Sequence, residues 1–446
     1  MINKVKDIFM QGISLCMIVK NEADMLGQCL DSIKDAVDEI VIVDTGSTDK
    51  TIEIAQLYGA GIVRTSWQDS FSKARNLSLE NALYKWILWT DADDIFPAES
   101  VKKILTLKNL EPSRCYGFRV KCSDNMDVLG PTVNQIRMFP NRASHRFRYR
   151  VHEQILPSLE ENGIGAEFTD ITVIHKGYGC HSMRSKQERN KRLIEMDMKE
   201  FPDNHGILYG YANALMDLDD MRKALKYYKA VIGVIKKKEG EAATHEGALF
   251  HIADIYWELQ DLVQCKEWLK KLLLQNPDYP QAIVLDGYLK ERDGNLAEAE
   301  EAFLKVLNIK ESETFIPVDF NQLKIRACSQ LKSIYFKKGE YKKANLMLYS
   351  ALCIKHGSTF SCHKMGEKIL SEKTDKGSVQ KAVELFTLGI LVKEDEVWRD
   401  YIGLSSVYSL AGDKKHACAV LNRGLAACPR QADVFRELLG RKADSC

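Results

Sequence analysis

The feature of this sequence that most restricts its fold is a spacing that recurs after about residue 200. A turn residue is followed five positions later by a small residue, and segments with helical periodicity lie on either side. Helix pairs of this kind bury their apolar faces only by stacking on one another, so the pattern predicts an all-α solenoid. The pairs are Asp219/Ala224, Gly294/Ala299, Gly339/Ala344, Gly377/Ala382 and Gly412/Ala417, with a degenerate copy at Asp261/Lys266.

These helix pairs resemble tetratricopeptide repeats, whose period is about 34 residues. Residues 247–280 and 400–429 carry the resemblance most clearly, and we expect five to six repeats over residues 205–440. The resemblance implies a concave face that holds a peptide or protein partner. A solenoid that only forms a homodimer, or that supports the domain before it, is the alternative.

The first 180 residues have a different pattern, in which short apolar runs alternate with amphipathic segments. The segments 21–36 and 47–59 have helical spacing and helix start signals. Such alternation predicts an α/β domain with a mainly parallel, Rossmann-like sheet that binds ligands at the carboxyl ends of its strands. The expected strands are residues 13–19, 39–44, 61–65, 85–91, 115–122 and 170–175.

Acidic residues gather where one of these strands ends, in the segment WILWTDADD. Asp91, Asp93 and Asp94 follow the strand directly, and Asn21 and Asp44 follow two others, so all should lie at one edge of the sheet. Neighbouring carboxylates repel one another unless a cation or hydrogen-bond donors offset their charge. Mg²⁺ or Mn²⁺ would do so while binding the phosphates of a substrate. An acidic turn before the next helix is the alternative.

Three ordered motifs resemble the GT-A fold of family 2 glycosyltransferases. They are residues 14–51, residues 67–83 (WQDSFSKARNLSLENAL) and WILWTDADD. The resemblance implies a GT-A domain over residues 12–182 that uses a nucleotide-sugar donor, most simply a UDP-sugar. It also implies that Asn21, Glu22 and Asp44 bind the nucleotide, that Asp91 lies near the ribose, and that Asp93 binds the metal ion.

Later motifs resemble a subset of this family that is fused to tetratricopeptide repeats. RMFPN (137–141), YRVHEQI (149–155) and VIHKGY (173–178) are similar to motifs of bacterial peptide S-glycosyltransferases of the glycocin (sublancin) type. The resemblance implies that His175 completes the metal site, and a neutral imidazole suits Mn²⁺. A buried structural histidine is the alternative for His175.

Transfer of a sugar requires cations that stabilise the leaving diphosphate and a base that activates the acceptor. The candidate cations are Arg75, Arg137 and Lys186, the last within the basic stretch 184–192. That stretch lies in an expected linker helix over residues 183–204, and a solvated helix face that joins the domains is its alternative role.

Enzymes of this family invert the anomeric centre, and the position of VHE in the motif favours Glu153 as the base. His152 would orient Glu153 or bind the acceptor, while Asp124 and Asp127 are reserve candidates for the base. Structural hydrogen bonding is the alternative role for Glu153 and His152.

Composition excludes several other classes of function. The 63 Lys and Arg nearly balance the 62 Asp and Glu, so no pull toward nucleic acid is expected. No segment has the length and hydropathy of a membrane span or signal peptide, and the 12 cysteines show no metal or disulfide spacing. A cytoplasmic location is therefore expected. A dehydrogenase is disfavoured because no GxGxxG follows the first strand, and no GxxxxGK[ST] loop is present.

We therefore predict a metal-dependent inverting glycosyltransferase that modifies a Cys, Ser or Thr side chain of a peptide or protein held by the repeats. Transfer to a cell-surface glycan or a small molecule, with repeats used for dimerisation, is one alternative. A non-catalytic adaptor that senses a nucleotide sugar is another.

Overall fold

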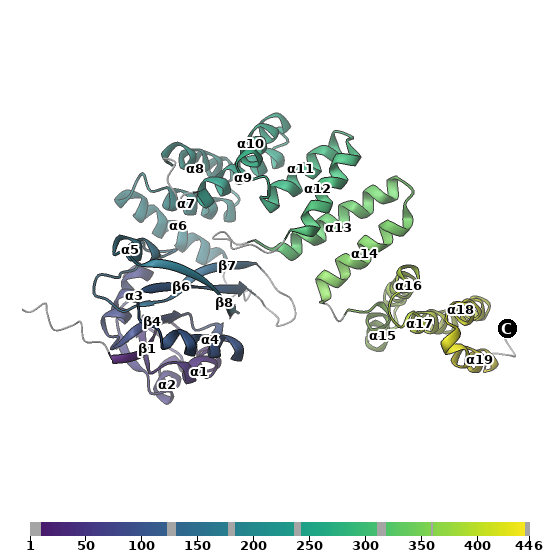
Figure 1. Ribbon diagram of the computed structural model, residues 1–446, viewed down its shortest axis with the longest axis horizontal. Helices are drawn as coiled ribbons and strands as arrows, with labels where there is room; N and C mark the ends of the chain where they lie inside the picture. Colours follow the sequence, from purple (N-terminus) through teal and green to yellow (C-terminus); the bar gives the residue numbers. More distant parts are fainter. Residues whose placement is uncertain are drawn as a thin grey trace, which may run out of the picture. The chain divides into compact units, whose positions relative to one another are not determined.

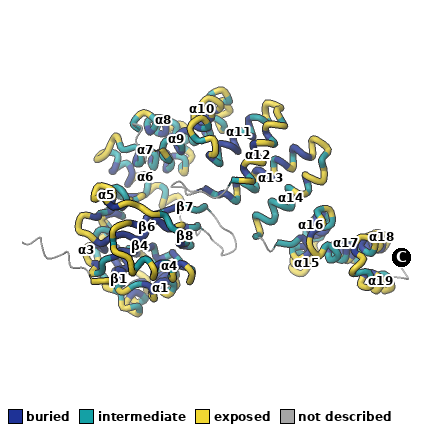
Figure 2. The backbone as a smooth tube through the Cα atoms, in the orientation of Figure 1, coloured by how far each residue is buried: buried dark blue, intermediate teal, exposed yellow. Residues whose placement is uncertain are grey.

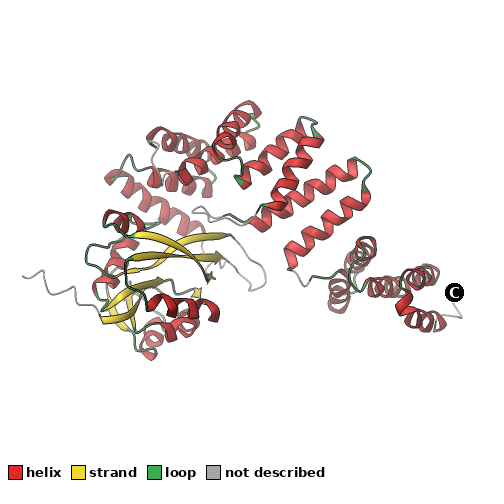
Figure 3. Cartoon of the chain, viewed as in Figure 1, coloured by secondary structure: helices red, strands yellow, loops and turns green. Residues whose placement is uncertain are grey.

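The computed structural model contains an α/β domain followed by helical hairpins (Figures 1 and 3). It describes residues 10–122, 131–176, 183–235, 242–309, 318–357 and 360–441. Strands are confined to the first part of the described chain, and helices alone follow α6 (Met183–Glu200). Both parts therefore have the fold class that the sequence predicts.

The α/β domain is built on an eight-stranded sheet with the order β3-β2-β1-β4-β7-β6-β8-β5. β1 pairs in parallel with β2 and β4, and β2 pairs in parallel with β3. β7 joins this parallel half to β6 through antiparallel pairs on both sides. The strands are β1 (Met10–Val19), β2 (Glu39–Asp44), β3 (Gly61–Arg64), β4 (Tyr84–Thr90), β5 (Asp94–Ile95), β6 (Arg114–Cys122), β7 (Thr132–Pro140) and β8 (Gly165–His175).

Helices cover both faces of the sheet because alternate residues of the strands are apolar on both sides. Leu15 and Met17 of β1 share a core with α1, α2 and α4, whereas Cys16 belongs to a second core with α3 and α5. The helices of this domain are α1 (Leu26–Ile33), α2 (Thr51–Leu57), α3 (Phe71–Glu80), α4 (Ala98–Lys108) and α5 (Leu156–Glu161), with a 3₁₀ turn at Lys34–Ala36.

All six expected strands are present, but β7 and the short β5 were not expected. The sequence of β7 contains the polar residues Asn134, Gln135 and Arg137. It therefore lacks the regular alternation of apolar and polar residues by which a half-buried strand is recognised. Its antiparallel pairing places Arg137 under the site described below.

The solenoid consists of helices, and several successive pairs of them are joined by short turns. Five of these turns have the same geometry, with one left-handed residue two positions after one helix ends and two before the next begins. The helices are α7 (His205–Asp217), α8 (Met221–Val234), α9 (Ala242–Glu258), α10 (Leu262–Gln275), α11 (Pro280–Arg292), α12 (Leu296–Asn308), α13 (Phe320–Lys337), α14 (Tyr341–His356), α15 (Cys362–Glu372), α16 (Lys376–Val392), α17 (Val397–Leu410), α18 (Lys414–Ala427) and α19 (Ala432–Gly440), with a 3₁₀ turn at Pro429–Gln431.

The left-handed turn residues largely confirm the predicted spacing. Asp219, Gly294, Gly339 and Gly412 have φ between 62° and 84°. The alanine five positions after each of them is buried. Figure 2 shows that buried and exposed positions alternate along the helices of the repeats.

Two of the predicted pairs of turn residue and small residue differ from the structure. The degenerate copy predicted at Asp261/Lys266 is wrong by one residue, because the left-handed residue is Gln260 and the buried one is Cys265. Asp261 instead caps α10 by accepting from the backbone amide of Gln264. Gly377 lies inside α16 and is not left-handed, although Ala382 is buried as expected.

The chain folds into two compact units. The first comprises Met1–Ala282 with Lys310–Phe320, and the second comprises Ile283–Ile309 with Asn321–Cys446. The α/β domain, α6 and the first four solenoid helices therefore belong to the same unit. Their shared core contains Val151 of the α/β domain, Leu193 of α6 and Ile207 of α7.

No helix in the described part of the chain is both long enough and apolar enough to cross a membrane.

Candidate functional site

The parallel register of the sheet brings three strand ends to one edge. Val19 of β1 lies opposite Asp44 of β2, and Met17 of β1 lies opposite Thr90 of β4. The residues that follow these strands, among them Asn21 and Asp91, therefore lie at the carboxyl edge, where parallel sheets bind ligands. This confirms the predicted position of the acidic segment.

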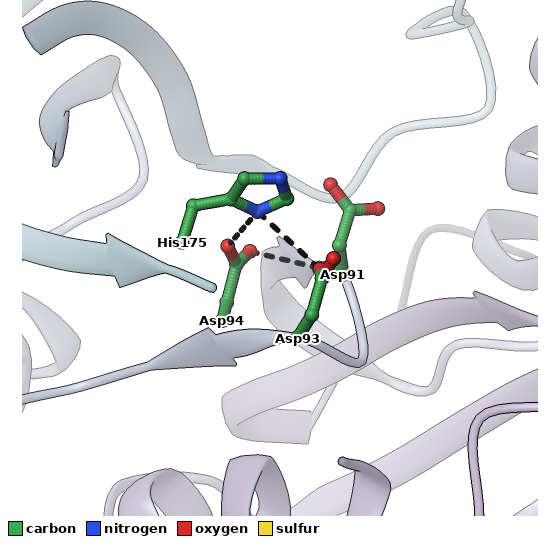
Figure 4. Close-up of side chains that lie close together, drawn as sticks. All are labelled: Asp91, Asp93, Asp94 and His175. Atoms are coloured by element: carbon green, nitrogen blue, oxygen red, sulfur yellow. Dashed lines mark hydrogen bonds and ion pairs between the residues drawn. The ribbon is translucent and has the colours of Figure 1, made fainter. Parts of the chain in front are cut away.

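A histidine from a distant strand joins the acidic residues. His175 is the last residue of β8, and β8 pairs with β5 so that His175 lies opposite Asp94. Figure 4 shows the carboxyl groups of Asp93 and Asp94 directed at the His175 ring. Nδ1 of His175 lies 3.0 Å from Oδ1 of Asp94 and 3.3 Å from Oδ1 of Asp93. Together with Asp91, these residues place their ligand atoms within 4.8 Å of one another.

Asp94 is fully buried and is held by four groups. Its Oδ2 accepts from the Arg137 guanidinium at 2.9 Å, the Thr90 hydroxyl at 2.8 Å and the backbone amide of Asp91 at 2.9 Å, while Oδ1 faces His175. Burial raises the pKa of Asp94, but Arg137 and His175 outweigh it and hold the pKa below the usual value. Asp94 is therefore an ionised anchor for its neighbours.

Asp93 is more accessible and less well paired. Burial raises its pKa, and so does the charge of Asp91, while His175 lowers it. For His175 itself burial lowers the pKa, but Asp94 and Asp93 reverse the balance and raise it above the usual value. In this arrangement a proton on His175 offsets part of the negative charge of the cluster.

The donor set fits a divalent ion. Two ligands that are each about 2.1 Å from one ion at a right angle lie about 3 Å apart. The 3.3 Å separation of Asp93 and His175 is close to that value. Carboxylate oxygen and imidazole nitrogen suit Mn²⁺ and related ions. Asp94 faces the same ring nitrogen, Nδ1, so an ion held between Asp93 and Nδ1 would replace the proton that His175 shares with Asp94.

Arg75 links two candidate residues that lie far apart in the sequence. From α3, its Nε donates to Oε1 of Glu153 at 2.6 Å and its terminal nitrogen donates to Oδ1 of Asp91 at 2.8 Å. Burial lowers the pKa of Arg75, but the Asp91 and Glu153 carboxylates together outweigh burial and raise the pKa above its usual value. This guanidinium therefore stays charged. Glu153 is therefore held near Asp91 by its ion pair with Arg75.

The Trp89 ring packs against both Arg75 and Arg137. The Cζ atoms of Arg75 and Arg137 lie 4.1 and 3.9 Å from its ring centroid. The indole N–H of Trp89 donates to the carbonyl of Ile136 at 2.7 Å, which fixes the ring. Cation–π contacts between desolvated groups contribute up to about 2 kcal/mol each. Sequence reasoning missed Trp89, and its place directly before an acidic strand end is the only signal for it.

The nucleotide candidates lie on two neighbouring loops. The Asn21 side chain accepts from the amide of Thr48 at 2.8 Å, so it joins the loops that follow β1 and β2. Asp44 is buried and accepts from the amide of Ser47 at 3.0 Å. Glu22 approaches the acidic cluster: burial first, then Asp93 and Asp91, raise its pKa to about 7.

The basic stretch 184–192 lies on α6 and has two kinds of contact. Lys186 is exposed and near enough to lower the pKa of Glu22 by its charge, which places it beside the site. Arg192 instead forms an ion pair with Asp69, and Arg189 lies over the ring of Phe71. The later part of this stretch thus joins the domain to α6, while Lys186 remains available to a ligand.

His152 is separate from the acidic cluster. It is exposed, has a left-handed φ of 53°, and lies beside Gly210 of α7. The reserve residues Asp124 and Asp127 lie outside the described residues.

Comparison with known proteins identifies both parts of the chain. Residues 14–159 match the model described as glycosyl transferase family 2, and residues 205–238 and 247–279 match the tetratricopeptide repeat model. A TPR repeat-containing protein of Synechococcus elongatus is 31% identical over 55% of this chain and 61% of its own length. The SPbeta prophage-derived glycosyltransferase SunS of Bacillus subtilis is 29% identical over 50% of this chain and 53% of its own length.

The chain thus spans between about half and three fifths of these curated relatives. Among solved structures, glucosyl-3-phosphoglycerate synthase from Mycobacterium tuberculosis in complex with Mn²⁺ and uridine-diphosphate-glucose is 24% identical. The alignment covers 25% of this chain and 44% of that one, with a TM-score of 0.22.

Proposed function

We propose, from a chain that carries a family 2 glycosyltransferase domain followed by tetratricopeptide repeats, that the protein transfers a sugar from a nucleotide-sugar donor to a polypeptide. The donor that we propose first is a UDP-sugar, and the acceptor atom belongs to a Cys, Ser or Thr side chain. The observation that carries the proposal is the group of Asp91, Asp93, Asp94 and His175 at the carboxyl edge of the sheet.

Asp93 and His175 would hold a divalent ion in this proposal. Such an ion supplies positive charge that stabilises a leaving diphosphate. Asp94 and Arg137 hold His175 in place, and Asp94 keeps its own charge because Arg137 is buried against it. Mn²⁺ or Mg²⁺ is the proposed ion.

The donor would lie along the carboxyl edge of β1, β2 and β4. Asp44 and the loop joined by Asn21 would contact the nucleotide, and Asp91, positioned by Arg75, would contact the ribose. Lys186 extends positive charge toward the same edge and would contact the diphosphate. With its pKa raised to about 7, Glu22 is about half ionised at neutral pH, and a cation beside the cluster would favour its charged form.

Glu153 is the proposed base for an inverting transfer, in which the acceptor is deprotonated as it attacks. Arg75 holds Oε1 of Glu153, which leaves Oε2 as the oxygen that would take the proton. A cysteine acceptor would reduce the demand on this base because its thiol is more acidic than a hydroxyl. The ion pair predicts that Glu153 works only while Arg75 positions it.

The repeats would hold the polypeptide acceptor, since solenoids of this kind present extended binding surfaces. A homodimer through the repeats, an S-linkage rather than an O-linkage, and a cytoplasmic location all stay predictions. The tetratricopeptide repeats, which resemble modules that bind polypeptides, favour a peptide acceptor over a glycan.

The test is calorimetric binding of UDP, GDP, UDP-glucose, UDP-N-acetylglucosamine and GDP-mannose to the full chain, with and without Mn²⁺. We expect one nucleotide class to bind only with the ion, and Asp93→Ala to lose that binding. Glu111→Ala, which removes an exposed carboxylate outside the site, is the matched control. The proposal fails if Asp93→Ala binds the donor as well as the control does.

Glu153→Gln separates binding from chemistry. It should bind the donor nearly normally but transfer sugar at least about 100-fold more slowly, which is the usual contribution of a general base. Equal losses of donor affinity in Glu153→Gln and Asp93→Ala would contradict the assignment of Glu153 as base.

A further inference from the structure

A second group of possible metal ligands lies in the second compact unit, far along the sequence from the acidic edge. His363 is at the start of α15, Glu394 is in the turn after α16, and Asp400 is in α17. Their ligand atoms lie within 4.8 Å of one another. They are 2%, 8% and 0% exposed, so the group is closed off from solvent.

Asp400 is the unusual member of this group. Neither of its carboxylate oxygens touches solvent or has a hydrogen-bond donor in the described part of the chain. A buried ionised carboxylate without a partner is strongly destabilising, so a native protein must neutralise it. Glu394 and Glu367 add two further negative charges near Asp400.

The backbone of α16 makes room for this carboxylate. A Cβ atom on Gly389 would lie 2.4 to 2.5 Å from the carboxyl atoms of Asp400, so only glycine fits there. The carboxyl group of Asp400 on α17 is thus packed directly against the backbone of α16. The packing is specific to Asp400 in this position.

The other two members are already oriented by neutral donors. Both oxygens of Glu394 accept from the backbone amide of Cys362 at 2.9 Å, and Oε1 also accepts from the Tyr349 hydroxyl at 3.2 Å. Nδ1 of His363 lies 2.8 Å from the Ser361 hydroxyl. A ring that donates from Nδ1 to Ser361 keeps the lone pair of Nε2 for an ion. Orientation of this kind is typical of residues around a bound metal.

We propose that His363, Glu394 and Asp400 bind a divalent transition-metal ion such as Zn²⁺ and that this ion joins α15, α16 and α17. One imidazole and two carboxylates are a donor set that zinc accepts, whereas Ca²⁺ and Mg²⁺ prefer oxygen ligands alone. The ion would neutralise both buried carboxylates at once. It would have a structural role, because the group is buried and lies in the repeats.

A proton shared between Asp400 and Glu394 is the competing way to neutralise the pair. The two explanations differ in Asp400→Asn. An asparagine amide can donate to Glu394 as a protonated Asp400 would, so a shared proton predicts almost unchanged stability. A bound ion predicts that the variant loses the ion and the stability that the ion confers.

The test uses the full chain with Asp93→Ala, so that an ion at the acidic edge is not counted. After removal of metals with a chelator, the protein is titrated with Zn²⁺ alone, and the bound zinc and the Tm are measured. We expect one tightly bound Zn²⁺ per chain and a rise in Tm. Asp400→Asn and His363→Gln in the same background should lose both.

Glu367→Gln is the matched control, because Glu367 is exposed and changes the local charge without belonging to the group. It should bind Zn²⁺ as its parent does. Co²⁺ gives a readout that needs no variant in the group: an ordered site with nitrogen and oxygen ligands produces visible absorption bands. The proposal is overturned if the Asp93→Ala chain shows no such bands, or if its zinc content and Tm match those of Asp400→Asn.

Discussion

At the scale of single residues, the site depends on a carboxylate that is closed off from solvent. Asp94 is fully buried, yet it connects Arg137, Thr90, the Asp91 backbone and His175. Each of these contacts fixes a group that borders the acidic edge. The half-buried members of the cluster are therefore positioned by a buried ion pair.

Breaking that pair should destabilise the α/β domain. Arg137→Met leaves Asp94 buried without its main cation, and removal of one partner of a buried pair costs about 3–5 kcal/mol. Urea unfolding of the donor-free protein measures the loss. Lys103→Met, which breaks an exposed pair with Asp170, is the control and should cost less than about 1 kcal/mol.

Adding Asp94→Asn to Arg137→Met should recover part of the stability, because the unpaired charge is then removed. If Arg137→Met is no more damaging than Lys103→Met, Asp94 does not depend on Arg137 for its charge.

The sequence predicts those site residues whose position follows from the strand pattern. Asp91 and Asp93 follow a strand, and a strand end at His175 is visible as an apolar run. The ion pairs of Arg75 with Asp91 and Glu153 are not predictable in this way, since Glu153 lies 78 residues from Arg75. Such contacts depend on how loops cross the sheet edge, which no local periodicity encodes.

At the scale of secondary-structure elements, turns of the solenoid depend on a left-handed residue. Gly339 has φ +73°, and a Cβ atom there would meet nothing within 4 Å. Its requirement is therefore conformational rather than steric. Gly377 has the same place in the sequence pattern but lies within α16, where no left-handed residue is required.

These two glycines should respond in opposite ways to alanine. Gly339→Ala should destabilise the protein by about 1 kcal/mol or more, because L-residues pay that cost in the left-handed region. Gly377→Ala should be neutral or stabilising by up to about 1 kcal/mol, since alanine favours helix over glycine. Urea midpoints of the two variants test this, and equal destabilisation would show that α16 begins later than Lys376.

A half-buried histidine in α9 should make the first repeats sensitive to acid. His251 stacks on Tyr228 with ring centroids 4.9 Å apart, and burial lowers its pKa from 6.5 to about 4. Above pH 6.5 both folded and unfolded chains hold it neutral. Between pH 6.5 and about 4, His251 binds a proton in the unfolded chain but not in the folded chain. The free energy of unfolding should therefore fall as the pH falls.

The measurement is Tm against pH for the parent chain and for His251→Phe, which keeps the stacking but cannot be protonated. The variant should lose less Tm than the parent across this window. His416→Gln removes an exposed histidine of α18 and is the control. Parallel curves for the parent and His251→Phe would contradict the assignment.

At the scale of the whole molecule, the α/β domain and the first repeats share a core. Val151 of the loop that precedes α5 packs with Leu193 and Ile194 of α6 and with Ile207 of α7. Arg150 reinforces this contact, since its backbone amide donates to Asp197 at 2.7 Å. The sequence shows the α/β pattern and the repeat pattern separately, and neither pattern requires the other. The shared core therefore cannot be predicted from them.

The shared core determines where the chain can be cut. A chain that ends at Glu200 keeps α6 but removes α7, so Leu193, Ile194 and Val151 lose their cover. Each buried aliphatic side chain contributes about 1.5–3 kcal/mol, and the loss should therefore amount to several kcal/mol. A chain that ends at Ala282 keeps α7 to α10 and should unfold near the temperature of the first transition of the full protein.

The same pair of chains tests the role of the repeats. With metal ion and donor present, the chain that ends at Ala282 should still hydrolyse the donor slowly, because every residue of the acidic edge is retained. Transfer to a polypeptide should fall if the second compact unit holds the acceptor. Full transfer by this chain would instead assign the acceptor surface to α6–α10, and equal stability of the two truncated chains would show that the core at Val151 is dispensable.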